Sequence, residues 1–74
     1  MAVSYKKLWH MLLDRNMLKK DLQSSAGLTG YVMNKLSRNE NVTTQTLGKI
    51  CNALNCTTDE IIEFVAEDEK SSKL

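Results

Sequence analysis

Residues 30 to 35 of the sequence place hydrogen-bonding groups where they could meet the edges of DNA bases. Lys35 can donate to the acceptor edge of guanine, Asn34 can pair with adenine, and Tyr31 can contact a thymine methyl group or a phosphate. Gly30 has no side chain, so the backbone there can approach a ligand closely. The sequence therefore predicts base contacts from Gly30, Tyr31, Asn34 and Lys35.

A second set of residues on either side of this segment offers donors to phosphate oxygens. Amide, hydroxyl and cationic side chains of this kind fix a protein on nucleic acid without reading its sequence. The set consists of Asn16, Lys19, Lys20, Arg38, Asn39, Asn41, Thr43 and Thr44. A single surface lysine is more often only solvated, but the convergence of this set around one turn favours a shared anionic ligand.

Two helices joined by a short turn must position these side chains. Apolar residues at intervals of four predict a helix over residues 18–26, and Gly27 provides its left-handed stop. Thr29 can cap the next helix, which continues to Ser37 or Arg38 and turns Val32, Met33 and Leu36 inward. Such a sharp turn is typical of a helix-turn-helix, whose second helix lies in the major groove.

The remaining chain favours three more helices and an all-α fold. A first helix is predicted over residues 5–15 from a Ser4 cap. A fourth is predicted over 45–54 from a Thr43 or Thr44 cap, and Gly48 within it suggests close packing against a neighbour. A fifth opens with a capping box, Thr57 to Glu60, and continues through Ile61, Ile62, Phe64 and Val65. The domain is expected to span residues 1–66, with a disordered tail over 67–74.

Charge is divided unevenly along the chain. Residues 1–40 contain seven lysines or arginines against three acids, a net charge of +4, whereas residues 41–74 contain three lysines against six acids, a net charge of −3. This division suits a protein whose basic half forms a face that binds phosphates, although an ordinary solvated surface explains the same charges equally well.

With these features in place, the segment from Leu18 to Ile62 resembles the Cro/CI-type (XRE) helix-turn-helix domain of phage repressors and small bacterial regulators. The resemblance covers about residues 5–65 and is based on Leu22, Gly27, Thr29, Met33, Leu36 and the later block LGKICNALNCTTDEII. It implies a compact five-helix, lambda repressor-like fold. Within the family, the chain resembles the small regulators of antibiotic-resistance gene clusters, including one of a vancomycin-resistance cluster.

The resemblance also implies roles for individual residues. Gly30, Tyr31 and Lys35 occupy the positions that usually read bases, and Lys19 occupies the position of a phosphate-binding glutamine. Three positions depart from the family pattern: Leu18 replaces a capping serine or threonine, Gln23 a small residue, and Gly30 a polar reader.

The predicted function is sequence-specific regulation of transcription, as a repressor or autoregulator acting on operator DNA. One such domain makes few base contacts, so a homodimer is expected, at least on DNA, with half-sites about 34 Å apart. Two alternatives stay open. One is a protein-interaction module of the same fold, antitoxin-like or an anti-regulator, that would use the fifth helix and Tyr31; the other is a redox sensor that would use Cys51 and Cys56.

Several other classes of function are not favoured by the sequence. The carboxylates have no nucleophilic or basic partner and no phosphate-binding glycine loop is present, so we expect no enzyme, cofactor or small-molecule ligand. Cys51 and Cys56 lack zinc-site spacing and are expected to be reduced core residues, and His10 a surface residue. The sequence contains no membrane span or signal peptide, which predicts a cytoplasmic protein.

Overall fold

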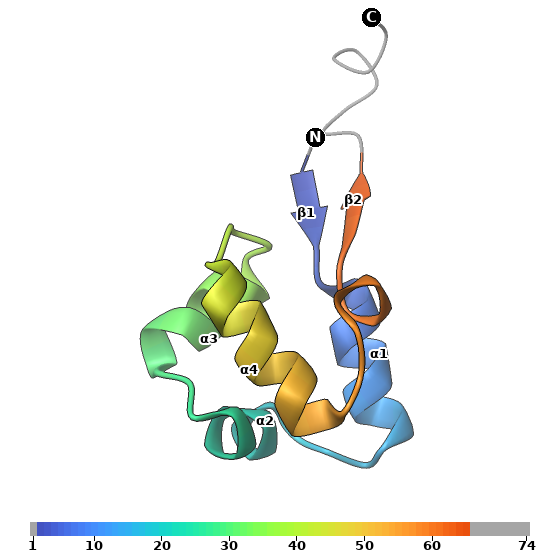
Figure 1. The fold of residues 1–74 in the computed structure, drawn as a ribbon, viewed down its shortest axis with the longest axis vertical. Helices are drawn as coiled ribbons and strands as arrows, with labels where there is room; N and C mark the ends of the chain where they lie inside the picture. The colour runs from blue at the N-terminus through green and yellow to red at the C-terminus, as the bar shows by residue number, and fades with distance from the viewer. Residues whose placement is uncertain (1, 66–74) are drawn as a thin grey trace, which may run out of the picture.

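Helices form most of the structure, a computed structural model that describes residues 2–65 (Figure 1). The elements in chain order are β1 (Ala2–Ser4), α1 (Lys6–Asp14), α2 (Lys19–Ala26), α3 (Gly30–Ser37), α4 (Thr44–Leu54), the 3-10 turn η1 (Thr58–Glu60) and β2 (Glu63–Val65). The first four predicted helices are confirmed, with ends that differ by one residue or so. The predicted tail over residues 67–74 lies outside the described residues.

The predicted fifth helix is wrong. Only its first turn forms, as η1, where a Glu60 carboxylate oxygen accepts a hydrogen bond from the Thr57 N–H at 2.9 Å. Ile61 is then fully buried, and the chain extends into β2. Aromatic and β-branched residues such as Phe64 and Val65 favour strands when a partner strand is within reach.

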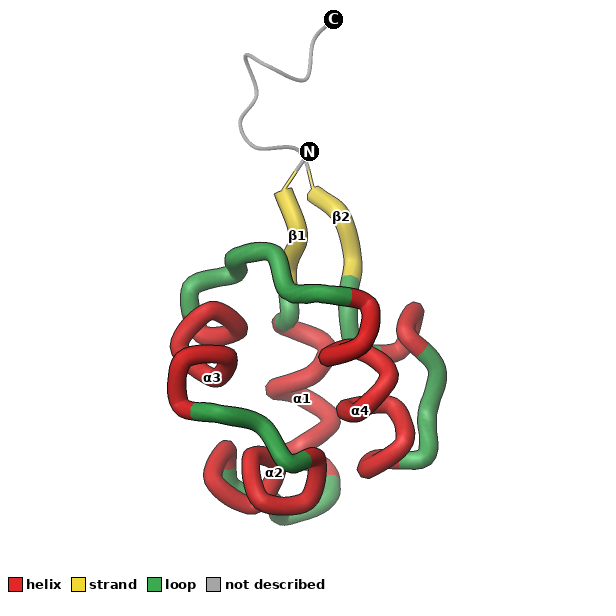
Figure 2. The backbone as a smooth tube through the Cα atoms, turned by 60° about the vertical axis from the view of Figure 1, so that its left-hand side comes forward, coloured by secondary structure: helices red, strands yellow, loops and turns green. Residues whose placement is uncertain are grey.

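The partner of β2 is the beginning of the chain. β1 and β2 pair antiparallel, with Val3 opposite Phe64, and together they project from the helices at one end of the molecule (Figures 1 and 2). The described residues therefore form a mostly helical fold with a two-stranded sheet, rather than the all-α fold that the sequence predicted.

The core draws on every helix and on β1. Its buried side chains are Val3, Tyr5, Leu8, Leu12, Leu22, Leu28, Met33, Leu36, Ile50, Leu54 and Ile61. α2 packs against α1, α3 and α4 at the end of the molecule opposite the two strands (Figures 1 and 2). Burial of apolar side chains from four helices fixes the angle at which α2 meets α3.

Candidate nucleic-acid interface

The turn between α2 and α3 has the geometry that the sequence predicted. Gly27 ends α2 in the left-handed region with a φ of 68°, and the Leu28 N–H donates to the Gln23 carbonyl oxygen at 2.9 Å. Leu28 itself is buried. The Thr29 hydroxyl oxygen then accepts from the Val32 N–H at 3.2 Å and caps α3. Both ends of the turn are thus fixed by local hydrogen bonds.

One side of α3 is buried and the other is open to solvent. Met33 and Leu36 pack in the core, while Gly30, Tyr31 and Asn34 are exposed and Lys35 is half-buried. Tyr31 is 70% exposed, so both its ring and its hydroxyl are accessible to a ligand.

Lys35 is held beside Tyr31 on this open side. Its Nζ atom lies 5.2 Å from the centre of the Tyr31 ring, one helical turn away, within the range of a cation–π interaction. The open space around Gly30 contains no atom within 4 Å of the position that a Cβ would occupy. The fold therefore does not require glycine at the start of α3.

The loop that follows α3 contributes to the same surface. A cavity of about 420 Å³ separates α3 from this loop and the start of α4, and its lining includes Tyr31, Lys35, Asn41 and Thr43. The cavity thus brings together two residues predicted to contact bases, Tyr31 and Lys35, and two predicted to contact phosphates, Asn41 and Thr43. Val32 and Val42 supply an apolar part of the lining.

Two of the predicted phosphate contacts also stabilise the fold. The Thr43 hydroxyl caps α4 by accepting from the Thr46 N–H at 3.2 Å, and it donates to the Thr46 hydroxyl at 3.1 Å. The Asn39 Oδ1 atom accepts from the Tyr5 N–H at 3.1 Å. The sequence predicted a cap at Thr43 or Thr44 but gave no sign of the Asn39 hydrogen bond, which leaves the Asn39 amide N–H groups as its donors to a ligand.

Lys19 and Lys20 are exposed in the first turn of α2, where they were expected to meet phosphates. The Nζ atom of Lys19 lies 4.4 Å from the centre of the half-buried Trp9 ring. Leu18 replaces the usual capping hydroxyl, and its N–H donates instead to the Asp21 carboxylate at 2.8 Å. This negative charge competes with an anion for the amides at the start of α2, so the lysine side chains remain the better phosphate donors.

Tyr5 and Arg15 join distant parts of the fold through hydrogen bonds that the sequence did not predict. The buried Tyr5 hydroxyl donates to the Glu40 carbonyl oxygen at 2.7 Å, and burial raises the pKa of this phenol. Arg15 donates from Nη1 to the Leu54 carbonyl oxygen at 2.6 Å, which joins the ends of α1 and α4. A tyrosine next to a predicted cap and an arginine at a helix end gave no distinguishing sequence signal.

Comparison with known families agrees with this geometry. The model of the Cro/C1-type HTH DNA-binding domain matches residues 7–67. The chain belongs to this family. A solved structure, the crystal structure of the transcriptional regulator VanUg, matches with a TM-score of 0.87 and 44% sequence identity, covering 89% of this chain and 88% of that one. The comparison with curated proteins gives no match.

These comparisons confirm the resemblance inferred from the sequence. The Cro/C1-type domain binds DNA by its description, and the similar structure is that of a transcriptional regulator. Both support DNA binding and regulation of transcription rather than catalysis. Among residues 2–65, no helix is both long and apolar enough to cross a membrane.

The two cysteines pack against the core of this Cro/C1-type domain. Cys51 and Cys56 are free thiols and partly buried, as expected. Burial and the neighbouring Cys51 raise the pKa of Cys56, so its thiol is held in the protonated form. Because the thiolate is the reactive species, the raised pKa lowers the reactivity of the Cys56 thiol at neutral pH.

Proposed function

We propose that the chain is a sequence-specific transcriptional regulator that reads operator DNA by placing α3 in the major groove. The observation that supports this most directly is the open side of α3, where Tyr31, Asn34 and Lys35 face solvent while Met33 and Leu36 lock the opposite side into the core. A helix held rigidly in this way can present hydrogen-bonding groups to base edges in a fixed register.

In this proposal the two predicted sets of residues have separate duties. Gly30, Tyr31, Asn34 and Lys35 contact bases, with Gly30 allowing the helix start to lie close to the DNA. Phosphates are contacted by residues at the ends of α1, α2 and α3 and in the following loop. These are Asn16, Lys19, Lys20, Arg38, Asn39, Asn41, Thr43 and Thr44.

The regulator acts as a homodimer on DNA, and its role is that of a repressor or autoregulator. A single α3 offers only three side chains to base edges, which is too few for tight specific binding, and two copies on successive half-sites double the number. The proposal also places the gene for this regulator in an antibiotic-resistance gene cluster. Similarity to the transcriptional regulator VanUg supports it.

Gel-shift and footprinting assays on the DNA upstream of its own gene, repeated over a series of salt concentrations, test the proposal. If phosphates and bases are bound as described, one short segment is protected and log affinity falls linearly with log salt, by about 0.9 per phosphate neutralised. Weak association that does not respond to salt on every fragment would contradict it. That result would favour the protein-interaction alternative, although the fifth helix on which that alternative relied is not formed.

A further inference from the structure

Two exposed leucines lie together at a groove between α1 and α2, and neither of them belongs to the proposed DNA contacts. Leu13 of α1 is 73% exposed, and Leu18 at the start of α2 is 61% exposed. Both line a cavity of about 290 Å³, which we call the α1–α2 groove and whose other lining residues are Trp9, Leu12, Met17 and Lys19. Exposed apolar side chains that lie together, rather than singly, mark surfaces that bind another molecule.

Leu18 serves neither the helix that it begins nor the core. It is the N-cap residue of α2, and no side-chain hydrogen bond caps the helix there. A serine or threonine at this position would accept a hydrogen bond from a free backbone amide of the first turn, which leucine cannot do. The departure from the family pattern at Leu18 therefore sacrifices a helix cap and adds apolar surface to the α1–α2 groove.

Lys19 gives this apolar groove a positive charge. Its Nζ atom lies 4.4 Å from the centre of the Trp9 ring, so the ammonium group stays next to the apolar lining. Among residues 2–65, Lys19 is the only charged residue that lines the groove. An occupant that carries a carboxylate can pair with Lys19 while its apolar side chains contact Leu13 and Leu18.

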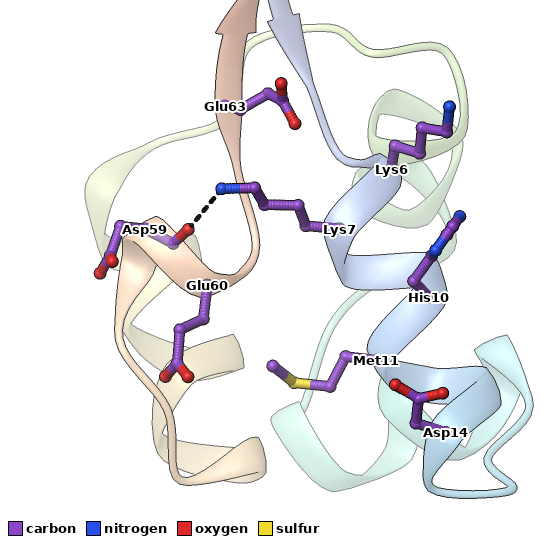
Figure 3. Close-up of a pocket in the computed structure, with 8 residues that line it drawn as sticks. All are labelled: Lys6, Lys7, His10, Met11, Asp14, Asp59, Glu60 and Glu63. Atoms are coloured by element: carbon purple, nitrogen blue, oxygen red, sulfur yellow. Dashed lines mark hydrogen bonds between the residues drawn. The ribbon is translucent and has the colours of Figure 1, made fainter.

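Acidic residues gather instead on a different side of α1. A cavity of about 720 Å³ lies there, between α1 and the η1–β2 segment (Figure 3), and the acidic residues that line it are Asp14, Asp59, Glu60 and Glu63. Lys7 lines the same cavity and donates to the Asp59 carbonyl oxygen at 3.1 Å. Since none of the acids described in residues 2–65 lines the α1–α2 groove, a two-fold axis between two grooves would set Lys19 near a second lysine. The charges thus favour a partner other than a second copy of this chain.

The size of the groove favours inserted side chains over a whole small molecule. Pockets that enclose small molecules usually measure about 300–1,000 Å³ and cover most of the ligand surface. At about 290 Å³, the groove lies just below this range. Amphipathic protein helices bind in apolar grooves by inserting side chains that are three or four residues apart. A protein segment of this kind therefore suits the groove better than a free metabolite does.

We propose that the α1–α2 groove binds an acidic amphipathic segment of a partner protein, with its apolar side chains against Leu13 and Leu18 and a carboxylate on Lys19. The regulatory use of the groove rests on the proposed function, in which Lys19 contacts a DNA phosphate. One ammonium group cannot pair fully with a phosphate and a carboxylate at the same time. The partner and operator DNA therefore compete, and each weakens the binding of the other by the same factor.

Selection from a phage-displayed library of random dodecapeptides on the immobilised full chain tests the groove. We expect the selected peptides to combine acidic residues with apolar residues three or four positions apart. Binding of a selected peptide that lacks tryptophan is then measured by fluorescence of Trp9, which lines the groove and is the only tryptophan of the chain.

Leu18→Ser and Phe64→Ser form the matched pair for this measurement. Phe64 is 62% exposed, close to the value for Leu18, but it belongs to β2 and does not line the groove. We expect Leu18→Ser to raise the peptide dissociation constant by about tenfold or more, as loss of an anchor residue does, and Phe64→Ser to leave it unchanged. Because Leu18→Ser also supplies the missing hydroxyl cap, it should fold at least as well as the wild type, which circular dichroism melting curves check.

Gel shifts with the operator fragment test the competition. The selected peptide should lower the affinity of the wild type for the fragment, and the same peptide concentration should have little effect on Leu18→Ser. A peptide that binds in the groove without releasing DNA would contradict the competition.

Three results would overturn the proposed partner. The selection could yield no acidic peptides with apolar pairs, or Leu18→Ser could bind the selected peptide as tightly as the wild type. Sedimentation could also show self-association that Leu18→Ser abolishes, which would identify a second copy as the occupant. Salt-dependent operator binding that persists in any of these cases would leave the proposed function standing. Peptide binding without operator binding would instead remove the proposed function and keep the groove, so the two failures are distinguishable.

Discussion

The Tyr5 hydroxyl donates a 2.7 Å hydrogen bond to the backbone carbonyl oxygen of Glu40, which ties the start of α1 to the loop after α3. The neighbouring Asn39 side chain accepts from the Tyr5 N–H, so two hydrogen bonds from one residue hold this loop. Because the loop leads to Asn41 and Thr43 on the candidate interface, Tyr5 holds this part of the interface in place.

Tyr5→Phe is expected to lower the free energy of unfolding by about 0.5–1.5 kcal/mol, because it removes the hydrogen bond that the buried Tyr5 hydroxyl donates to the backbone carbonyl oxygen of the exposed residue Glu40. Urea unfolding followed by circular dichroism measures this change. The matched control is Tyr31→Phe, which removes a hydroxyl from an exposed ring and should leave stability unchanged. Equal stability of Tyr5→Phe and the wild type would show that the hydrogen bond is not stabilising.

Burial of Tyr5 predicts a loss of stability at alkaline pH. Its pKa is raised above the ordinary value of 10.0, so above about pH 10 the unfolded chain releases the phenol proton more readily than the folded chain does. The contribution of Tyr5 to stability is therefore fully present below that pH and falls as pH rises through the raised pKa. The difference in unfolding free energy between the wild type and Tyr5→Phe should shrink over this range.

Absorbance of tyrosinate provides a direct check on the same group. The chain contains two tyrosines, so Tyr31→Phe leaves Tyr5 as the only one. Its ionisation should occur at higher pH in the folded protein than in urea. Coincident titration curves would contradict the prediction.

Local sequence patterns predicted the four helices and the turn, because each depends on neighbours in the chain. The three and four spacing around Leu22 and Met33, the Thr29 cap and the Gly27 stop are all local signals, and the structure contains them as expected. The open side of α3 follows from the same spacing, so the exposed positions of Gly30, Tyr31 and Asn34 could also be predicted.

Contacts between distant parts of the chain could not be predicted in this way. Phe64 fits the apolar spacing of a helix, but in the structure it pairs with Val3, near the other end of the chain. The residues around Phe64 in the sequence do not indicate this partner. The hydrogen bonds of Tyr5 and Arg15 likewise reach residues 35 and 39 positions away. The family resemblance implied a fifth helix as well, so it did not correct the local interpretation.

Gly48 was expected to pack closely against a neighbouring helix, and the structure shows that this interpretation is wrong. The residue is exposed in α4, and a Cβ there would have no atom within 4 Å. Gly48→Ala should therefore raise the free energy of unfolding by about 1 kcal/mol, because alanine loses less backbone entropy in a helix. Thermal denaturation measures the gain.

Gly27 serves as the control for Gly48, because its replacement should lower stability rather than raise it. Its φ of 68° is unfavourable for a β-branched residue, so Gly27→Val should lower the melting temperature while Gly48→Ala raises it. If both substitutions shift the melting temperature in the same direction, the two glycines do not differ as the structure indicates.

Lys35→Ala should relax base preference, since Lys35 lies on the open side of α3 next to Tyr31. We expect a loss of about 1–3 kcal/mol on the preferred operator and little change on unrelated DNA. Competition gel shifts with operators substituted at each base pair locate the position affected. Lys19→Ala is the matched control, because loss of a phosphate contact weakens all sequences alike and reduces the salt slope by about one unit. If Lys35→Ala leaves the base preference unchanged, Lys35 is not one of the residues that contact bases.

The contact between Lys19 and Trp9 allows DNA binding to be followed without a label. Trp9 is the only tryptophan of the chain, and the Lys19 Nζ atom lies 4.4 Å from its ring centre. A phosphate that binds Lys19 draws the ammonium group toward itself and weakens its interaction with the ring. Titration with operator DNA should therefore change Trp9 fluorescence in the wild type and in Lys20→Ala, whose lysine is adjacent in sequence, and the change should be lost in Lys19→Ala. Persistence of the change in Lys19→Ala would show that another contact perturbs Trp9, and Lys19 would lose its proposed place at the DNA backbone.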